Sequence, residues 1–401
     1  MPNRPASRLA DIAPFHVMEL MAQAQALETE GRTVIHMEVG EPDFATADPI
    51  LEAAHRFLSG GHVHYTAALG LNQLRESISG FYHTRYGLDI APERIVVTSG
   101  ASGALLLALG VLVNPADEWL LPDPGYPCNR HFVRTLEGRP VSLAVTAQSN
   151  YQPTAAQVAG AWTERTRGLL VASPANPTGT LLDRDEMTDL ARIVDARGGT
   201  LLVDEIYHGL TYGIETDTAL AISDDIFVIN SFSKYFGMTG WRLGWLVAPQ
   251  CYVREVEKLA QNLFIAPSTV AQHAALAAFH PETTAILEGR RHEFSLRRDV
   301  LLPGLRNLGF KVAAEPQGAF YVYADSSGLA ADSNQLAQQL LTEAGVAATP
   351  GLDFGNNRPQ EHMRFAYTIE RHRIEEGLAR MAAVLGSRYP GIPSSPKGTR
   401  T

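Results

Sequence analysis

Cysteine, positive charge and long apolar runs are all scarce in this sequence of 401 residues. The two cysteines, Cys128 and Cys251, are too few for a disulfide framework, so a reducing compartment is expected. The formal net charge of -10 leaves no basic excess with which to bind nucleic acid. No run reaches the roughly 18 apolar residues that a membrane span needs, and the N-terminus lacks the apolar core of a signal peptide. We therefore expect a cytoplasmic protein with neither nucleic-acid nor membrane partners.

The middle of the chain alternates short apolar runs with helical patterns. The helical patterns lie at 101–113 and 184–197. The apolar runs, each bounded by polar or turn residues, are 95–98, 119–121, 141–144, 168–172, 200–203, 227–230 and 243–247. Strands that alternate with helices predict an α/β fold with a mostly parallel sheet covered on both faces.

The pattern changes after about residue 280, which predicts a second, smaller α+β domain. A charged helical stretch runs from 287 to 302, where Pro303 and Gly304 predict its end. The remaining elements expected outside the large sheet are helices at 16–30, 72 onward and 334–345, and strands at 33–39, 318–323 and 363–366. We predict a large domain at 45–282, a small domain made of 1–44 and 283–389, and a disordered Pro/Ser/Gly-rich tail at 390–401.

The stretch from Ser231 to Arg242 carries the strongest chemical pattern. Lys234 follows a buried strand, and aromatic residues, glycines and Arg242 surround it in sequence. A cationic neighbour and partial desolvation both lower the pKa of a lysine, and a neutral amine attacks carbonyl groups. Ser231, Ser233 and Arg242 are groups of the kind that hold a phosphate. A lysine that can bond an aldehyde, next to groups that can hold a phosphate, indicates pyridoxal phosphate. The alternative is that Lys234 is a surface residue, as most lysines at such positions are.

Other short motifs follow strands of the same predicted sheet, and each also has a structural interpretation. The segment 98–103 joins a strand to a helix, so its N–H groups suit a phosphate or close packing. Asp204 and Tyr207 end a strand, where they suit a heterocycle or a helix cap. The remaining candidates are Asn176 in a Pro/Gly turn, Tyr126 in a stiff loop, and Arg364, a fork for a carboxylate or a surface charge.

Taken in order, these motifs resemble those of the class I/II pyridoxal-phosphate-dependent aminotransferases of fold type I. The resemblance extends over about residues 10–388, and its most specific segments are 175–179, 204–207 and 231–244. It implies a seven-stranded, mostly parallel sheet in the large domain. It also implies pyridoxal 5′-phosphate as the cofactor and a ping-pong transfer of an amino group from an L-amino acid to a 2-oxoacid. No metal site is predicted.

The resemblance also implies a role for each matching position. Lys234 bonds the cofactor aldehyde and later moves a proton, Asp204 pairs with the ring nitrogen, and Tyr207 and Asn176 contact the ring oxygen. Tyr126 stacks on the ring. The phosphate is expected to bind Ala101, Ser102, Ser231, Ser233 and Arg242. Arg364 and the backbone of Gly40 bind the substrate carboxylate together with Asn176, and Tyr65 reaches the partner subunit's site, so a homodimer with shared sites is expected.

Two alternatives and the substrate remain open. A C–S lyase or an elimination enzyme like aminocyclopropane-carboxylate synthase shares these motifs, whereas a DNA-binding regulator is disfavoured by the acidic charge and the early start of the pattern. The side-chain pocket is expected to include Phe15, His16, Tyr65 and 262–265 of a neighbouring subunit. These residues are mainly apolar, and no second arginine is evident, so neutral donors are favoured over aspartate. Cys128 is interpreted as a packing residue.

Overall fold

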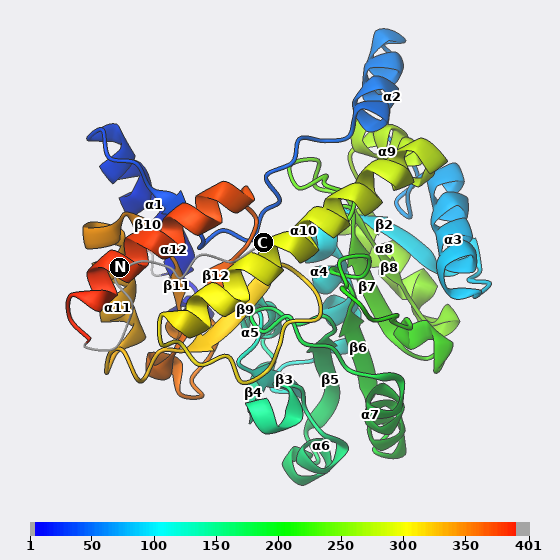
Figure 1. Cartoon of the computed structure of the whole chain (residues 1–401). Coiled ribbons are helices and arrows are strands. Elements are labelled where there is room, and N and C mark those ends of the chain that lie inside the picture. The colour runs from blue at the N-terminus through cyan, green and yellow to red at the C-terminus, as the bar shows by residue number, and fades with distance from the viewer. Residues whose placement is uncertain (1–4, 390–401) are drawn as a thin grey trace.

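The computed structural model describes residues 5–389, so the predicted disordered tail lies outside the described residues. Its centre is a seven-stranded sheet with the order β2-β8-β7-β6-β5-β3-β4 (Figure 1). The strands are β2 (Ile95–Thr98), β3 (Glu118–Asp123), β4 (Arg139–Ala144), β5 (Thr166–Ala172), β6 (Thr200–Asp204), β7 (Phe227–Ser231) and β8 (Gly244–Val247). Only β8 runs antiparallel to its neighbours in this sheet. The predicted fold class is confirmed, and each strand overlaps one of the seven apolar runs.

Both faces of the sheet are buried, which explains why its strands are apolar almost throughout. Trp119 and Leu121 pack on one face, whereas Leu120 between them packs on the other. The first face is covered by α4 (Gly100–Leu112), α5 (Pro127–Thr135) and α8 (Val253–Leu263). The second is covered by α3 (Asn72–Tyr86), α6 (Ala155–Ala161) and α7 (Arg184–Ala196).

A second group of elements joins the two ends of the described chain. β1 (Ile35–His36) pairs in parallel with β10 (Val346–Ala347). Next to this pair lies a three-stranded antiparallel sheet of β11 (Thr349–Pro350), β12 (His362–Ala366) and β9 (Tyr321–Asp325). The helices here are α1 (His16–Thr29), α11 (Ser333–Gln339), which continues as a π-helical turn to Ala344, and α12 (Arg371–Gly386). The domain boundaries near residues 45 and 283 remain a prediction.

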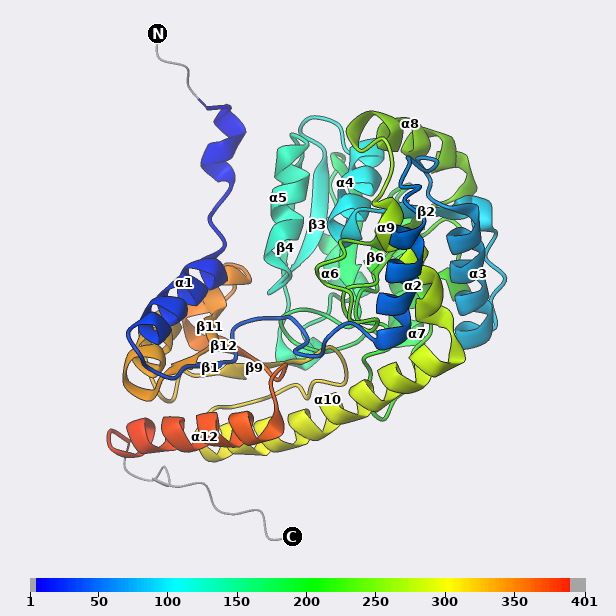
Figure 2. The ribbon, with the colours of Figure 1, turned by 90° about the horizontal axis from the view of Figure 1, so that it is seen from above.

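The helix predicted to end at Pro303 does not end there. α10 (Pro281–Asn307) runs through Pro303 and reaches from the large sheet to α12 (Figure 2). Gly304 lies so close to α12 that an added Cβ would be 2.3 Å from Leu378 Cδ1. Burial of Leu301, Leu302 and Leu305 outweighs the one backbone hydrogen bond that a proline removes.

Two predicted strands also differ from the observed elements. The strand expected at 33–39 is reduced to Ile35 and His36, because only these residues find a partner in β10. The strand expected at 318–323 begins at Tyr321, since Gly318 instead forms an isolated bridge with Thr211. Strand formation therefore depends on the neighbouring segment as well as on the apolar pattern.

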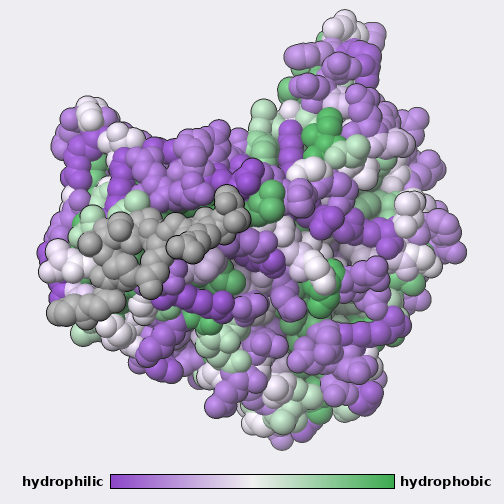
Figure 3. Space-filling view, in the orientation of Figure 1, coloured by the Kyte–Doolittle hydropathy of each residue, from purple (hydrophilic) through white to green (hydrophobic). Residues whose placement is uncertain are grey.

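α2 (Asp48–Ser59) projects from the body of the molecule beside α9 (Thr269–Ala275), as Figure 1 shows. The face in Figure 3 is mostly polar, with small separate apolar patches. Within residues 5–389, no helix has both the length and the apolar character needed to cross a membrane.

The sheet topology determines where a site can form. Because β2, β3, β5, β6 and β7 are mutually parallel, their carboxyl ends lie along one edge of the sheet. The segments that leave this edge carry most of the site residues predicted from the sequence, whereas Gly40 follows β1 and Arg364 lies on β12. A crevice at the carboxyl ends of parallel strands is the usual ligand site of open α/β sheets.

Candidate active site

A cavity of about 450 Å³ opens at this edge of the sheet. It brings together most of the predicted site residues, namely Gly40, Ala101, Ser102, Tyr126, Asn176, Asp204, Tyr207, Ser233, Lys234, Arg242 and Arg364. Ser231 lies just outside it, buried, and donates a hydrogen bond to Ser233 Oγ at 2.9 Å. Tyr65 does not line the cavity and is 81% exposed. Cys128 is partly buried and also lies outside the lining.

The Lys234 amine reaches the cavity from the loop after β7. Its Nζ donates to the Gly40 carbonyl at 2.6 Å and lies 5.6 Å from the centre of the Phe320 ring. Burial, together with Arg364 and Arg242, lowers the pKa of Lys234 from 10.5 to about 8, against the opposing effects of Glu41 and Asp204. A substantial fraction of this amine is therefore neutral near pH 8, the form that attacks an aldehyde.

Asp204 ends β6 and faces the same cavity. Its Oδ1 accepts a hydrogen bond from the Ile206 N–H at 3.0 Å. Burial raises the pKa of Asp204 to about 6, although the Ile206 N–H and the nearby Lys234 act in the opposite direction. A buried carboxylate without a salt bridge suits a protonated heterocyclic nitrogen, because the pair would compensate both charges.

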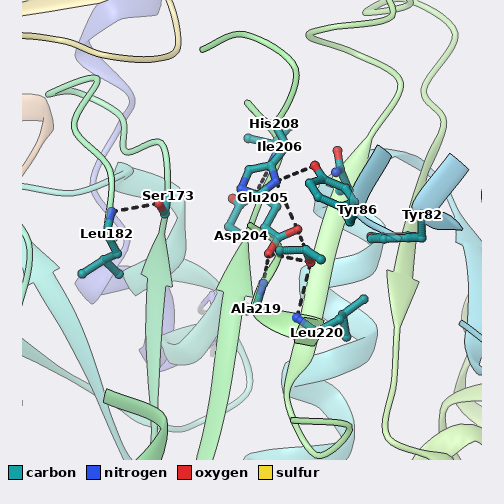
Figure 4. A network of polar contacts seen from close by, with 12 residues as sticks. Tyr82, Tyr86, Ser173, Leu182, Asp204, Glu205, Ile206, His208, Ala219 and Leu220 are labelled. Carbon is teal, nitrogen blue, oxygen red and sulfur yellow. Dashed lines mark hydrogen bonds and ion pairs between the residues drawn. The ribbon is translucent and has the colours of Figure 1, made fainter. Parts of the chain in front are cut away.

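A polar network behind Asp204 holds this segment in place (Figure 4). Glu205 accepts hydrogen bonds from the Ala219 N–H at 2.7 Å and from the Thr218 hydroxyl at 2.9 Å. His208 lies 3.5 Å from Glu205, and its Nδ1 contacts the Tyr86 hydroxyl at 2.9 Å. The network ties the loop with Asp204 to α3 and to the 218–220 turn. Burial raises the pKa of Glu205 to about 8 and lowers that of His208 to about 3.

Glu205→Gln is expected to become more stable relative to the native protein as the pH rises. The folded pKa of Glu205, about 8, lies above its ordinary value of 4.5. Its contribution to stability is therefore complete below pH 4.5 and is lost as the pH rises through 8. Between pH 4.5 and 8, the free energies of unfolding of the native protein and of Glu205→Gln should diverge by up to about 1.4 kcal/mol per pH unit. Urea unfolding at several pH values measures this, with the exposed Glu164→Gln as control. Parallel pH profiles for both variants would contradict the assignment.

The opposite end of the cavity is suited to an anion. Ala101 and Ser102 lie in the first turn of α4, where N–H groups lack helical partners and the helix dipole is positive. Arg242 projects toward the same turn. Gly100 allows this approach, because it has φ +71° and an added Cβ would be 2.7 Å from Arg242 Nη2. Backbone donors, serine hydroxyls and a guanidinium together match a phosphate monoester.

Gly100→Ala is expected to weaken cofactor binding by about tenfold to a hundredfold. The methyl group would strain the left-handed backbone and displace Arg242, and a hydrogen bond to a charged group contributes about 1.5–3 kcal/mol. Fluorescence titration of the cofactor-free protein with pyridoxal phosphate measures the dissociation constant. Gly103→Ala is a matched control in the same helix, since its Cβ would meet nothing closer than 3.5 Å. Equal affinities for the two variants would contradict the assignment.

Arg364 is a buried cation with no carboxylate partner. Its side chain is 3% exposed, and it takes part in none of the ion pairs found within residues 5–389. Nη1 donates to Asn176 Oδ1 at 3.0 Å, and Nη2 donates to the Glu38 carbonyl, whereas Nε has no acceptor among the described residues. The guanidinium carbon lies 4.4 Å from the centre of the Tyr321 ring. A buried, hydrogen-bonded guanidinium with an unused donor suits a carboxylate.

Tyr321 is a site residue that the sequence motifs did not indicate. Its hydroxyl contacts the Tyr207 hydroxyl at 2.9 Å, and it lines the cavity. An added Cβ at Gly40 would be 1.9 Å from this hydroxyl, so any larger residue at position 40 would displace the Tyr321 ring. Sequence alone offers no signal for this contact, because Tyr321 falls in a segment that reads as an ordinary β-strand.

The observed groups fit the cofactor that the family resemblance implies. The cavity has an amine for the aldehyde, a carboxylate for the ring nitrogen, a tyrosine for the ring face and an anion cradle at the far end. The same cavity, with a volume of about 450 Å³, extends to Arg364. No single one of these residues indicates pyridoxal phosphate, but their combination in one cavity does.

Comparisons with known proteins identify the family of this chain. Residues 32–381 match the family described as aminotransferase class I and II. The chain is 38% identical to the valine–pyruvate aminotransferase of Mycobacterium tuberculosis, over 97% of this chain and 100% of that protein. It is 35% identical to the aspartate aminotransferase of Thermotoga maritima, over 95% and 99%. The solved structure of an aminotransferase from Mycobacterium tuberculosis superimposes with a TM-score of 0.93 at 37% identity, covering 96% of this chain and all of that one.

Proposed function

Because this chain belongs to the class I and II aminotransferases, a family that uses pyridoxal phosphate, we propose that it holds this cofactor on Lys234 and transfers the amino group of a neutral amino acid to a 2-oxoacid. The observation that carries the substrate assignment is Arg364. Its guanidinium is buried beside the Lys234 cavity and lacks a carboxylate partner among the described residues. An amino acid supplies that carboxylate, and its amino group then lies on the side of Lys234.

Each residue has a separate task in this proposal. When bound, the cofactor supplies an electron sink for the substrate Cα carbanion. Arg364 and the Gly40 backbone orient the substrate carboxylate, which determines which bond to Cα breaks. Asp204 keeps the ring nitrogen protonated, and Tyr207 and Asn176 contact the ring oxygen. Lys234 Nζ would move the proton between the substrate Cα and the carbon of the cofactor that carried the aldehyde, for which a pKa near neutrality is favourable.

The lining of the cavity favours a neutral side chain over an acidic one. Lys234, Arg242 and Arg364 are the only lysines or arginines among the described residues that line it, and the proposal uses all three. One wall of the cavity is apolar and is formed by the start of α1, with Phe15, Val17, Met18 and Met21. His16, which was expected in this pocket, does not line the cavity. A distal carboxylate would have no cation of this chain to pair with, so its desolvation would be uncompensated.

A set of half-reactions tests the proposal. Purified holoenzyme is mixed with single amino acids, and the change in cofactor absorbance and the released 2-oxoacid are measured. Alanine, leucine and phenylalanine are expected to react faster than aspartate, whereas a strong preference for aspartate would overturn the substrate assignment. Release of ammonia or a thiol without a 2-oxoacid acceptor would indicate elimination, which the named relatives do not favour.

We further propose a homodimer with shared sites. Tyr65 is 81% exposed, and Leu58, Val63, Leu263 and Ile265 are exposed apolar neighbours in its region. This region is held together by a hydrogen bond from the Thr269 hydroxyl to the His64 carbonyl at 2.6 Å. An exposed tyrosine among apolar side chains is typical of a protein interface. Sedimentation at micromolar concentration tests this, and a fully active monomer would overturn it.

A further inference from the structure

The apolar wall of the active-site cavity comes mainly from the first turns of α1. Met18 and Met21 line the cavity, while Leu20 and Ala24 on the other side of the helix are buried against Leu341. The helix is thus fixed by one face and offers flexible methionines on the other. Methionine fills irregular spaces and adapts to ligands of different shape.

α1 has no capping side chain of its own. Its N-cap residue, Phe15, makes no side-chain hydrogen bond to the first turn. Instead, the two carboxylate oxygens of Asp353 accept the N–H groups of His16 at 2.9 Å and Val17 at 2.8 Å. Asp353 is 4% exposed and lies more than 300 positions away in sequence. The carboxylate satisfies two helix donors and complements the positive end of the helix.

The turn 351–355, which contains Asp353, also contacts Arg364. Phe354 follows Asp353, and its ring centre lies 4.9 Å from the Arg364 guanidinium carbon. The Asp353 carbonyl accepts a hydrogen bond from Arg130 Nη2 at 2.7 Å, which anchors the turn to α5. The turn 351–355 therefore contacts both the group proposed to bind the substrate carboxylate and the helix that forms the side-chain wall.

We infer that Asp353 is a positioning residue for substrate selection: through its cap on α1, it sets the distance between Arg364 and the wall of Phe15, Met18 and Met21. The wall accepts unbranched and aromatic apolar side chains, so each added methylene of the donor gains contact with it. This inference rests on the proposed transamination. Asp353 itself does not line the cavity and touches no reacting atom.

A homologous donor series tests the inference with the holoenzyme. The donors are alanine, 2-aminobutyrate, norvaline and norleucine, and kcat/KM is measured for each. In the native protein, kcat/KM is expected to rise up to about fourfold per methylene. Asp353→Ala should reduce the norleucine-to-alanine ratio at least tenfold, and Asp353→Asn should reduce it less, because its amide oxygen can accept one of the two N–H groups. A ratio does not depend on the fraction of active enzyme, so a general loss of stability would not change it.

Two further variants separate an effect on the position of α1 from a general effect on folding. Asp332→Ala removes the corresponding cap from α11, where Asp332 Oδ1 accepts the Asn334 N–H at 2.9 Å, and should leave the ratio unchanged. Met21→Ala shortens the wall without disturbing the cap and should lower the ratio at least fivefold. An unchanged ratio in Asp353→Ala and Met21→Ala would overturn the inference, as would an equal fall in Asp332→Ala. If the native protein deaminates none of the four donors, the proposed function itself fails.

Discussion

Lys234→Ala is expected to lower turnover by at least about four orders of magnitude while the protein remains folded. The substitution removes both the nucleophile for the cofactor aldehyde and the proton carrier, and general acid–base catalysis alone contributes about 10²–10⁴. The amine faces the cavity and donates to the Gly40 carbonyl, and it takes part in none of the ion pairs found within residues 5–389, so its loss breaks no salt bridge there. Single-turnover kinetics with alanine measure the effect. Lys258→Ala, an exposed lysine of α8, is the matched control and should retain normal turnover.

The pH dependence of cofactor capture gives an independent test of this lysine. Because only the neutral amine is nucleophilic, the rate at which cofactor-free protein bonds pyridoxal phosphate should rise with pH and level off above about 8, the pKa of Lys234. Borohydride reduction followed by peptide mass mapping should place the added mass on Lys234. Modification at another lysine, or normal turnover in Lys234→Ala, would refute the assignment.

Arg364→Leu is expected to lower kcat/KM for amino acids by about 30-fold to 5,000-fold. Loss of one partner of a buried, hydrogen-bonded charge pair costs about 2–5 kcal/mol, and the substrate carboxylate would be left unpaired. Arg364→Lys should recover only part of this loss, because a lysine lacks the planar fork that bonds Asn176 and the Glu38 carbonyl at once. Initial rates with norleucine at varied concentration measure kcat/KM.

An amine without a carboxylate provides the control for Arg364. Pentylamine has the side chain and amino group of norleucine but lacks its carboxylate, so its slow reaction should be the same in the native and Arg364→Leu enzymes. A parallel loss with both compounds would show that Arg364 supports the fold of the site rather than binding the substrate. Unchanged kinetics with norleucine would place the carboxylate elsewhere.

The sequence by itself determined the sheet and the part of the site that the sheet carries. Each strand is a local apolar run ended by polar or turn residues, so its position is readable without knowledge of its neighbours. Once the strands are parallel, their carboxyl ends meet at one edge, which brings Asp204 and Lys234 together. Family motifs at the same strand ends then indicated Asn176, Tyr126 and Arg242, which line the same cavity.

Arg364 and Gly40 on the substrate side of the cavity were predicted from the sequence, but only the tertiary structure showed how other elements enclose this side. The Tyr321 hydroxyl reaches Tyr207 across 114 positions, and Asp353 caps α1 across 337. The continuation of α10 through Pro303 likewise depends on its packing against α12. Such contacts arise where separate elements pack, and their energy depends on the distance between elements rather than on any local pattern of residues. Strand ends follow from local sequence, whereas the space left beside them for a substrate follows from how the helices and the small sheet pack around it.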